Sequence, residues 1–363
     1  MTTLFDAGQL GAVSVKNRVF LAPLARNRAQ PDGVPGDLAA TYYAQRASGG
    51  LLITEATQVS AMGKGYINTP GIYSDAQVAR WKEITDAVHA QGGKIFLQLW
   101  HVGRISHVSL LPAGEVPLAP SAIKADSQTF TDQGPTDVSE PREMTQEDIL
   151  KTVAEYKQAA ENAKAAGFDG VEVHAANGYL LDQFLQDKTN QRTDNYGGSV
   201  ENRFRFLGEI LDVVVDIWGA DRVGVRLSPT GTFNDMGDSD VAATFGYVIE
   251  QLNQRNLAYL HMVEKFPGID SGDAEQKLLT SLRRKWNGFY IANGAFDGDN
   301  GESAIESGYA DAIAYGRPFL ANPDLPERLQ AGAPLNEADA NTFYGGGAEG
   351  YTDYPFMADA KAA

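Results

Sequence analysis

The sequence contains no cysteine. This absence excludes disulfide bonds, thiolate nucleophiles, and zinc or iron–sulfur centres held by cysteine. The five histidines are scattered along the chain and do not form a substitute set of metal ligands. His101 and His107 are too far apart for a HExxH helix face, and no dense set of acidic residues accompanies them. We therefore expect no catalytic metal.

Long apolar runs and positive charge are also scarce. No stretch approaches the roughly 20 apolar residues that a membrane span requires, and the start Met1–Asp6 lacks the character of a secretory leader. The formal net charge is −17. An acidic protein repels nucleic acid and anionic membranes, so neither is an expected partner. These features predict a soluble, cytoplasmic protein, either a monomer or a small homo-oligomer.

Dedicated nucleotide-binding motifs are missing as well. A GxGxxG spacing occurs only at Gly345–Gly350, and it is not a Rossmann motif because no predicted strand precedes it. The glycine run Gly345–Gly347 has no strand before it and lacks the Lys-Ser/Thr pair that completes a P-loop. We therefore do not expect a Rossmann domain or a P-loop.

The chain instead contains a regular alternation of short apolar runs and helical segments. Strands are predicted at Arg18–Ala22, Leu51–Glu55, Lys94–Trp100, Gly170–His174, Arg222–Ser228, Ala258–Val263, Gly288–Ala292 and Asp311–Gly316. Helices are predicted at Leu38–Ala47, Ala76–Ala90, Ile149–Ala165, Val200–Trp218, Val241–Gln254, Gln276–Trp286, Gly301–Ser307 and Asp324–Gln330. Continuous apolar runs suit parallel strands buried on both faces. Because eight strands close a barrel, we predict one (β/α)8 TIM barrel domain over residues 1–363 rather than a doubly wound sheet.

Local signals agree with these helices and locate the remaining residues. Capping-box pairs occur at Ser74 with Gln77 and at Thr145 with Asp148, and helix-ending glycines occur at Gly92-Gly93 and Gly167. A barrel of this type takes about 250 residues, so the chain has length to spare. The surplus lies in Ile105–Arg142, Lys265–Asp273 and Asn336–Ala363. Loops that follow strands lie at the C-terminal mouth of a barrel, where active sites form.

Several polar residues would meet at that mouth because each ends a strand. They are Gln98, Trp100, His174, Arg226 and the pair Gly316-Arg317. The run from His174 to Tyr179 is the most informative of these, because it places a hydrogen-bonding pair and a phenol directly after a buried strand. Such a group can hold and polarise a carbonyl-like oxygen while the phenol supplies a proton.

Ordered blocks of the sequence resemble the old yellow enzyme family from about residue 4 to about residue 355. The blocks are Ala22-Pro23-Leu24 with Arg26, Tyr42–Ala47, Gln98–Arg104, His174–Leu180, Arg192–Ser199, Gly316–Phe319 and Asn322–Leu325. The tail Phe343–Pro355 further resembles the bacterial branch with N-ethylmaleimide and glycerol trinitrate reductases. The resemblance implies a flavoprotein that holds FMN non-covalently and is reduced by NADPH or NADH. Its substrates would be electron-poor alkenes: α,β-unsaturated ketones, aldehydes, imides and nitroalkenes.

The resemblance also implies which residues hold the cofactor. They are Pro23, Leu24, Ala25, Ala56, Gln98, Arg226, Asn293, Gly294, Gly316 and Arg317. Gln98 would hydrogen-bond the pyrimidine part of the flavin, and Arg226 would place a positive charge near its N1/O2 edge. Gly294, Gly316 and Arg317 would bind the phosphate. Without the resemblance, Arg226 could equally sit in a buried ion pair, and the glycines could simply end strands.

The same comparison implies the residues that act on the substrate. His174 and Asn177 would hold the carbonyl or nitro oxygen, a hydride would pass from flavin N5 to the β-carbon, and Tyr179 would protonate the α-carbon. NAD(P)H and the alkene would occupy the site in turn, which is a ping-pong scheme. The substrate-binding residues would be Tyr66, Trp100, His174, Asn177 and Tyr344.

Two further points follow from the resemblance. Ala25 stands where the bacterial branch generally has a threonine that hydrogen-bonds the flavin, so we expect a lower flavin reduction potential than in threonine-bearing relatives.

The alternatives to alkene reduction are reductive denitration of nitrate esters on the same scaffold, a flavin-binding protein without turnover, and a metal-dependent barrel hydrolase. The hydrolase would need a ligand cluster that the five histidines do not supply.

Overall fold

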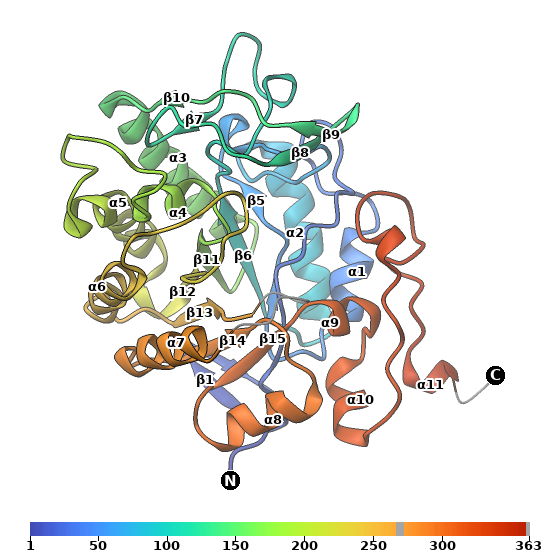
Figure 1. The fold of residues 1–363 in the computed structure, drawn as a ribbon. Coiled ribbons are helices and arrows are strands. Elements are labelled where there is room, and N and C mark those ends of the chain that lie inside the picture. Colours follow the sequence, from blue (N-terminus) through green and yellow to red (C-terminus); the bar gives the residue numbers. More distant parts are fainter. Residues whose placement is uncertain (266–271, 361–363) are drawn as a thin grey trace.

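A closed ring of parallel strands forms the centre of the computed structural model, which describes residues 1–265 and 272–360 (Figure 1). In order around the ring, the strands are β3 (Val19–Leu21), β4 (Leu52–Ile53), β6 (Ile95–Trp100), β11 (Gly170–Ala175), β12 (Val223–Leu227), β13 (Tyr259–Val263), β14 (Tyr290–Asn293) and β15 (Ala312–Tyr315). The ring closes where β15 pairs with β3, with Ile313 opposite Val19. The predicted (β/α)8 barrel is confirmed, and each predicted strand overlaps an observed one.

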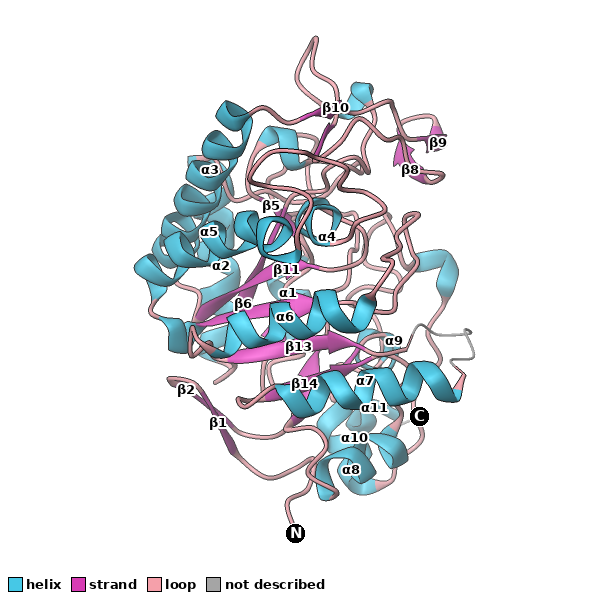
Figure 2. Cartoon of the chain, turned by 60° about the vertical axis from the view of Figure 1, so that its left-hand side comes forward, coloured by secondary structure: helices cyan, strands magenta, loops and turns pink. Residues whose placement is uncertain are grey.

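Helices surround the barrel and alternate with its strands (Figure 2). They are α1 (Ala39–Gln45), α2 (Asp75–Ala90), α3 (Gln146–Ala165), α5 (Val200–Trp218), α6 (Val241–Asn253), α7 (Asp273–Lys285), α8 (Gly298–Glu306) and α10 (Leu325–Ala331). Both predicted capping boxes are confirmed, since the Ser74 and Thr145 side chains accept the backbone N–H three residues ahead. Gly92 and Gly167 have φ angles of 71° and 83°, as expected of left-handed helix endings. None of the described helices is both long and apolar enough to traverse a lipid bilayer.

Several short elements escape the sequence patterns. They are the hairpin of β1 (Gly8–Leu10) and β2 (Val13–Val15), β5 (Thr57–Gln58), β7 (Leu118–Ala119) paired with β10 (Arg142–Glu143), the hairpin of β8 (Gln128–Thr131) and β9 (Gly134–Asp137), α4 (Leu180–Leu185), α9 (Arg317–Ala321), α11 (Met357–Ala360), and single 3₁₀ turns at Ala61–Gly63, Val108–Leu110, Ala220–Arg222 and Ala340–Thr342. Each is too short to show a helical or alternating period. The segment Ile105–Arg142 was predicted to be one long loop, but in the structure it contains the β8–β9 hairpin. Most of Lys265–Asp273, the second predicted excursion, lies outside the described residues.

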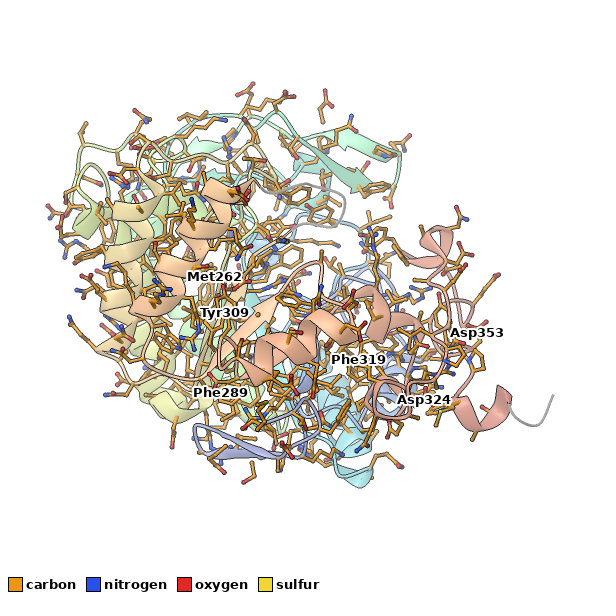
Figure 3. The ribbon with its side chains drawn as sticks, turned by 60° about the horizontal axis from the view of Figure 1, so that its bottom comes forward. Met262, Phe289, Tyr309, Phe319, Asp324 and Asp353 are labelled. Carbon is orange, nitrogen blue, oxygen red and sulfur yellow. The ribbon has the colours of Figure 1, made fainter. Side chains whose placement is uncertain are left out.

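The N-terminal end of the barrel is filled with apolar side chains. Phe20, Ile53, Phe96 and Ile291 form one buried cluster with Val13 of the β1–β2 hairpin. Phe289 stacks on Phe20 beside this cluster, and Figure 3 shows that end of the molecule. The hairpin thus closes the barrel from below, and open space remains at the opposite end, where the strands reach their carboxyl ends.

One glycine in the barrel wall gives room to a large neighbour. In the strand register, Gly224 of β12 lies between Glu172 of β11 and Tyr259 of β13. A Cβ at Gly224 would come within 2.2 Å of the Tyr259 ring. We expect Gly224→Ala to lower the free energy of unfolding by about 1–3 kcal/mol, because overpacking a filled interior forces side chains and backbone to shift. Denaturant titration followed by circular dichroism measures this change.

Gly246→Ala provides the matched control. Gly246 lies on α6, where a Cβ would meet the Lys285 side chain at 3.4 Å, an ordinary contact distance. Because alanine favours a helix over glycine by about 1 kcal/mol, this variant should be as stable as the unmodified protein or more so. Equal stability of Gly224→Ala and the unmodified protein would contradict the steric argument.

Candidate active site

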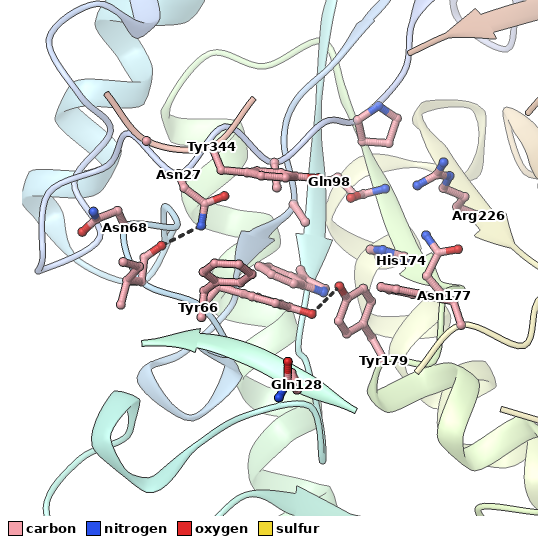
Figure 4. A pocket seen from close by; sticks show the side chains of 18 residues that line it. Asn27, Tyr66, Asn68, Gln98, Gln128, His174, Asn177, Tyr179, Arg226 and Tyr344 are labelled. Carbon is pink, nitrogen blue, oxygen red and sulfur yellow. Dashed lines mark hydrogen bonds between the residues drawn. The ribbon is translucent and has the colours of Figure 1, made fainter. Parts of the chain in front are cut away.

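A cavity of about 520 Å³ opens at the C-terminal mouth of the barrel (Figure 4). Most of the residues predicted from the sequence to form the site line it: Pro23, Ala25, Ala56, Tyr66, Gln98, Trp100, His174, Asn177, Tyr179, Arg226 and Tyr344. They come from strand ends and loops that are far apart in the sequence, and the closed barrel brings them together. Five predicted residues do not line the cavity: Leu24, Asn293, Gly294, Gly316 and Arg317.

The loop between β11 and α4 is held in one conformation. Asn177 and Gly178 have φ angles of 57° and 77°, a region that asparagine and glycine adopt most readily. The Asn177 N–H donates to Ser228 Oγ at 2.7 Å, and its carbonyl accepts from Asn234 Nδ2 at 2.8 Å. The Gly178 N–H donates to Asp182 Oδ2 at 2.9 Å. These contacts fix the direction in which the Asn177 and Tyr179 side chains leave the backbone.

His174 is a neutral hydrogen-bond donor. Its Nδ1 accepts the backbone N–H of Ala176 at 3.3 Å, so the proton of the neutral ring lies on Nε2. Burial is the main cause that lowers the pKa of His174 to about 3, and the positive charge of Arg226 adds to it. The side chain therefore offers an N–H, and not a positive charge, to a ligand in the cavity.

Tyr179 is a protonated phenol next to His174. Its hydroxyl forms a hydrogen bond of 3.0 Å with the hydroxyl of Tyr66 (Figure 4). The rings of Trp100 and His174 meet the Tyr179 ring edge-on, with centroid distances of 5.1 and 5.2 Å. Burial raises the pKa of Tyr179 to about 12. The phenol therefore keeps its proton throughout the neutral pH range and can donate it.

Gln98 and Arg226 form a polar wall of the cavity. The Arg226 Nη2 donates to Asn293 Oδ1 at 2.6 Å, and Asn293 Nδ2 donates to the Ala314 carbonyl at 2.8 Å. Asn293 does not line the cavity itself, but its two hydrogen bonds hold the Arg226 side chain in position. In the described part of the chain, Arg226 forms no ion pair, so the alternative reading of a simple buried salt bridge is not supported.

Several buried polar atoms at the cavity lack a partner within the described residues. They are Arg226 Nε, Asn177 Oδ1 and Trp100 Nε1. Because a buried polar group without a hydrogen bond is costly, such atoms at a cavity wall indicate a polar ligand. A flat heterocycle with nitrogen and oxygen atoms along one edge, such as the isoalloxazine of FMN, fits this set.

The turns after β14 and β15 suit a phosphate. Gly294 follows β14 with a φ of 143°, and a Cβ there would come within 2.5 Å of the Lys265 carbonyl oxygen. Gly316 follows β15 and lies against Leu24. A Cβ built on Gly316 would lie 3.4 Å from Leu24 Cδ2. Arg317 is exposed, with its guanidinium 5.8 Å from the centre of the Phe343 ring. Glycines that expose backbone N–H groups, together with a nearby arginine, form the kind of site that binds phosphate in barrel enzymes.

The sequence patterns miss part of the lining. The missed residues are Asn27, Ile67, Asn68, Gln128, Phe130, Phe233 and Gly345. Gln128 and Phe130 belong to β8, and Phe233 follows β12, so these residues lie on segments without a strong period. Glu172 is also absent from the predicted site, although a carboxylate inside an apolar strand indicates a polar network. Residues 1–265 and 272–360 contain no group of three or more histidines, aspartates or glutamates placed to hold a metal ion.

Comparison with known proteins agrees with this arrangement. The NADH:flavin oxidoreductase / NADH oxidase family matches residues 3–336. The 12-oxophytodienoate reductase 1 of Oryza sativa subsp. japonica is 47% identical over 355 residues, which cover 96% of this chain and 92% of that protein. The structure of morphinone reductase in complex with tetrahydroNAD is 48% identical, with a TM-score of 0.92 over 98% of both chains. An old yellow enzyme homologue from Zymomonas mobilis is 42% identical, with a TM-score of 0.94 over 98% of this chain and 100% of the other.

Proposed function

The chain belongs to the NADH:flavin oxidoreductase / NADH oxidase family, and from this premise we propose how the cavity residues divide the reaction among them. The protein is an FMN-dependent NAD(P)H oxidoreductase that reduces the C=C bond of activated alkenes. FMN, when bound, supplies the hydride chemistry that no amino-acid side chain can provide. The resemblance to old yellow enzymes is therefore confirmed at the level of the family.

We propose that the flavin lies against Pro23, Ala25 and Ala56, with its polar edge toward Gln98 and Arg226. Arg226 Nε, which has no hydrogen-bond partner in the part of the chain that the structure describes, supports this placement. The phosphate side is assigned to Gly294, Gly316 and Arg317, which lie where β14 and β15 end. Leu24, which follows β3, is assigned to the flavin, and Asn293 acts by holding Arg226. The morphinone reductase complex with tetrahydroNAD supports a nicotinamide reductant that enters the same cavity. The GxGxxG spacing at Gly345–Gly350 neither follows a strand nor opens a helix, so it does not form a separate dinucleotide site.

His174, Asn177 and Tyr179 are the proposed catalytic residues. The Nε2–H of His174 and the side-chain amide of Asn177 hold the oxygen of the substrate's carbonyl or nitro group, which makes the β-carbon electrophilic. Tyr179 gives its proton to the α-carbon. Tyr66, Trp100 and Tyr344 form aromatic walls that exclude water and position the substrate.

The observation that carries this proposal is the meeting of a neutral imidazole, an amide and a protonated phenol in one cavity beside a buried arginine. Its test begins with purified protein incubated with FMN and passed through gel filtration. Protein that stays colourless would contradict the proposal. Yellow protein is reduced anaerobically with NADPH and mixed with enones, imides, nitroalkenes and nitrate esters. Nitrite release from the esters alone would favour reductive denitration, and no reoxidation by any substrate would indicate flavin binding without turnover.

The pKa values predict a flat pH profile for the alkene half-reaction. The pKa of about 3 keeps His174 neutral at higher pH, and the pKa of about 12 keeps Tyr179 protonated at lower pH. Neither group changes charge between about pH 6 and pH 9, so neither should introduce a break in the rate. Anaerobic stopped-flow reoxidation of reduced protein by an enone measures the profile. A break in this range that disappears in Tyr179→Phe would contradict the assignment.

Ala25 lines the cavity in place of a hydroxyl-bearing residue. We expect Ala25→Thr to raise the flavin reduction potential, because a new donor to the ring stabilises its electron-rich reduced form. Equilibration with a reference dye of known potential measures the shift. Ala25→Ser serves as a second donor variant and should shift the potential in the same direction. A potential in Ala25→Thr equal to or below that of the unmodified protein would refute the expectation.

We further propose that residues 1–363 form one FMN-binding domain, supported by the contribution of segments from Pro23 to Gly345 to a single cavity. Small-molecule alkenes are the proposed partners. The cytoplasmic location, the monomeric or small homo-oligomeric state, and the absence of nucleic-acid and membrane partners stay predictions from the sequence.

A further inference from the structure

A carboxylate is buried in the barrel interior one layer below the cavity. Glu172 precedes His174 by two residues on β11, so both side chains leave the same face of the strand. The Glu172 side chain is completely buried and does not belong to the cavity lining. In the strand register it lies opposite Gln98 of β6, which does line the cavity. Glu172 therefore contacts the site through another residue.

Three donors converge on this carboxylate. Its Oε1 accepts a hydrogen bond of 2.7 Å from Gln98 Nε2. Its Oε2 accepts from the Tyr259 hydroxyl at 2.9 Å and lies 2.8 Å from His261 Nδ1. Tyr259 comes from β13 and reaches Glu172 across β12, which is possible because Gly224 has no side chain in its path. The three donors thus come from β6 and β13, which lie on either side of β11 and β12.

The carboxylate is ionised and its imidazole neighbour is neutral. Burial alone would raise the pKa of Glu172, but the hydrogen bonds from His261 and Gln98 and the positive charge of Arg226 lower it below its usual range. Burial lowers the pKa of His261. The buried Nε2 of His261 has no partner among the described residues, which fits a neutral ring that donates through Nδ1. Glu172 therefore adds one negative charge to a cavity wall whose positive charge is Arg226.

The carboxylate also determines how Gln98 is oriented. An ionised carboxylate only accepts hydrogen bonds, so the Gln98 amide must direct its nitrogen, and not its oxygen, toward Glu172. The amide oxygen and the second N–H then remain for the cavity side, which Gln98 lines. A side-by-side acceptor and donor matches the C=O and N–H edge of a cyclic imide, the group found in the pyrimidine part of a flavin.

We propose that Glu172 is a positioning residue that fixes the Gln98 amide and offsets the charge of Arg226, and thereby determines how strongly the cavity prefers reduced over oxidised flavin. The proposal rests on the assignment of this cavity to FMN. Reduced flavin carries more negative charge than oxidised flavin, so a negative group near it disfavours the reduced form. Glu172 thus keeps the flavin a stronger reductant than Arg226 alone would allow.

Glu172→Gln tests this directly, because it keeps the shape of the side chain and removes its charge. The expected result is a rise in the flavin midpoint potential, equivalent to about a tenfold greater preference for reduced flavin, or about 30 mV for a two-electron couple. Fluorescence titration of the apoprotein should also show weaker binding of oxidised FMN, because Gln98 loses its fixed orientation. Equilibration with a reference dye gives the potential without any measurement of turnover.

Two further variants make the test specific. Asp324→Asn removes another buried carboxylate, one that pairs with Arg328 on α10 away from the cavity, and should leave the potential unchanged. Tyr259→Phe keeps the ring beside Gly224 but removes one donor to Glu172, so the less shielded carboxylate should lower the potential. If Glu172→Gln does not fold, Tyr259→Phe decides the question.

The outcomes separate this proposal from the assignment of the cofactor. An unchanged or lower potential in Glu172→Gln, or an unchanged or higher potential in Tyr259→Phe, would overturn the role of Glu172. A shift in Asp324→Asn as large as that in Glu172→Gln would also overturn it, since the position of the charge would then be irrelevant. Unmodified protein that binds no FMN would instead contradict the proposed function itself.

Discussion

Tyr179→Phe is expected to slow alkene reduction by about 10²–10⁴-fold while flavin reduction by NADPH proceeds at its normal rate. The phenol is the only proposed proton donor to the α-carbon, and hydride uptake from a nicotinamide requires no such proton. The ring itself stays in place, since Trp100 and His174 contact its edges. Anaerobic stopped-flow spectrophotometry measures the two half-reactions separately.

A matched phenol outside the cavity serves as the control. Tyr196 donates its hydroxyl to Glu209 and does not line the cavity, so Tyr196→Phe should leave both half-reactions unchanged. Equal slowing of the two half-reactions in Tyr179→Phe would indicate a disturbed flavin site. Full alkene reduction in that variant would show that the proton comes from elsewhere.

His174→Ala is expected to lower kcat/KM for an enone by about 10²–10³-fold, the usual effect of removing one donor to a developing negative oxygen. The Nε2–H of His174 is directed to the ligand by the bond that Nδ1 accepts from Ala176. The inhibition constant of a saturated ketone should rise in parallel, because the same oxygen is held without chemistry. Steady-state kinetics at fixed NADPH, with and without this ketone, measures both effects.

Two comparisons identify the cause of such a loss. His174→Asn restores an N–H donor of shorter reach and should recover part of the activity. FMN affinity should change little in either variant, since neither removes Gln98 or Arg226. If His174→Ala reduces enones at the normal rate, the oxygen is held by other groups, and Asn177 becomes the first candidate.

The sequence predicts the barrel because its strands are continuously apolar and its helices carry explicit end signals. The Ser74 and Thr145 caps and the Gly92 and Gly167 endings depend only on neighbouring residues, so they can be read from the chain alone. The β8–β9 hairpin could not be predicted in this way, since Gln128–Thr131 is short and its two buried residues are threonines and not apolar side chains. Its stability depends on contacts with distant segments.

The same distinction applies to the site. His174, Asn177 and Tyr179 are found from the sequence because they follow one strand in a compact run. Phe130 lines the same cavity from β8 and Phe233 from the loop after β12, and their separation in the sequence does not indicate that they lie close together in space. The role of Glu172 depends on the register of β6, β11, β12 and β13, which only the folded barrel provides.

The β1–β2 hairpin and the apolar cluster above it determine from which end of the barrel reactants enter the cavity. They fill the N-terminal end of the barrel, so within residues 1–265 and 272–360 the cavity opens toward the carboxyl ends of the strands. A reductant and an acceptor that enter from this end would compete for the same space, in keeping with the expected alternation of NAD(P)H and alkene. The width of this opening would then limit the size of the molecules that the enzyme can process.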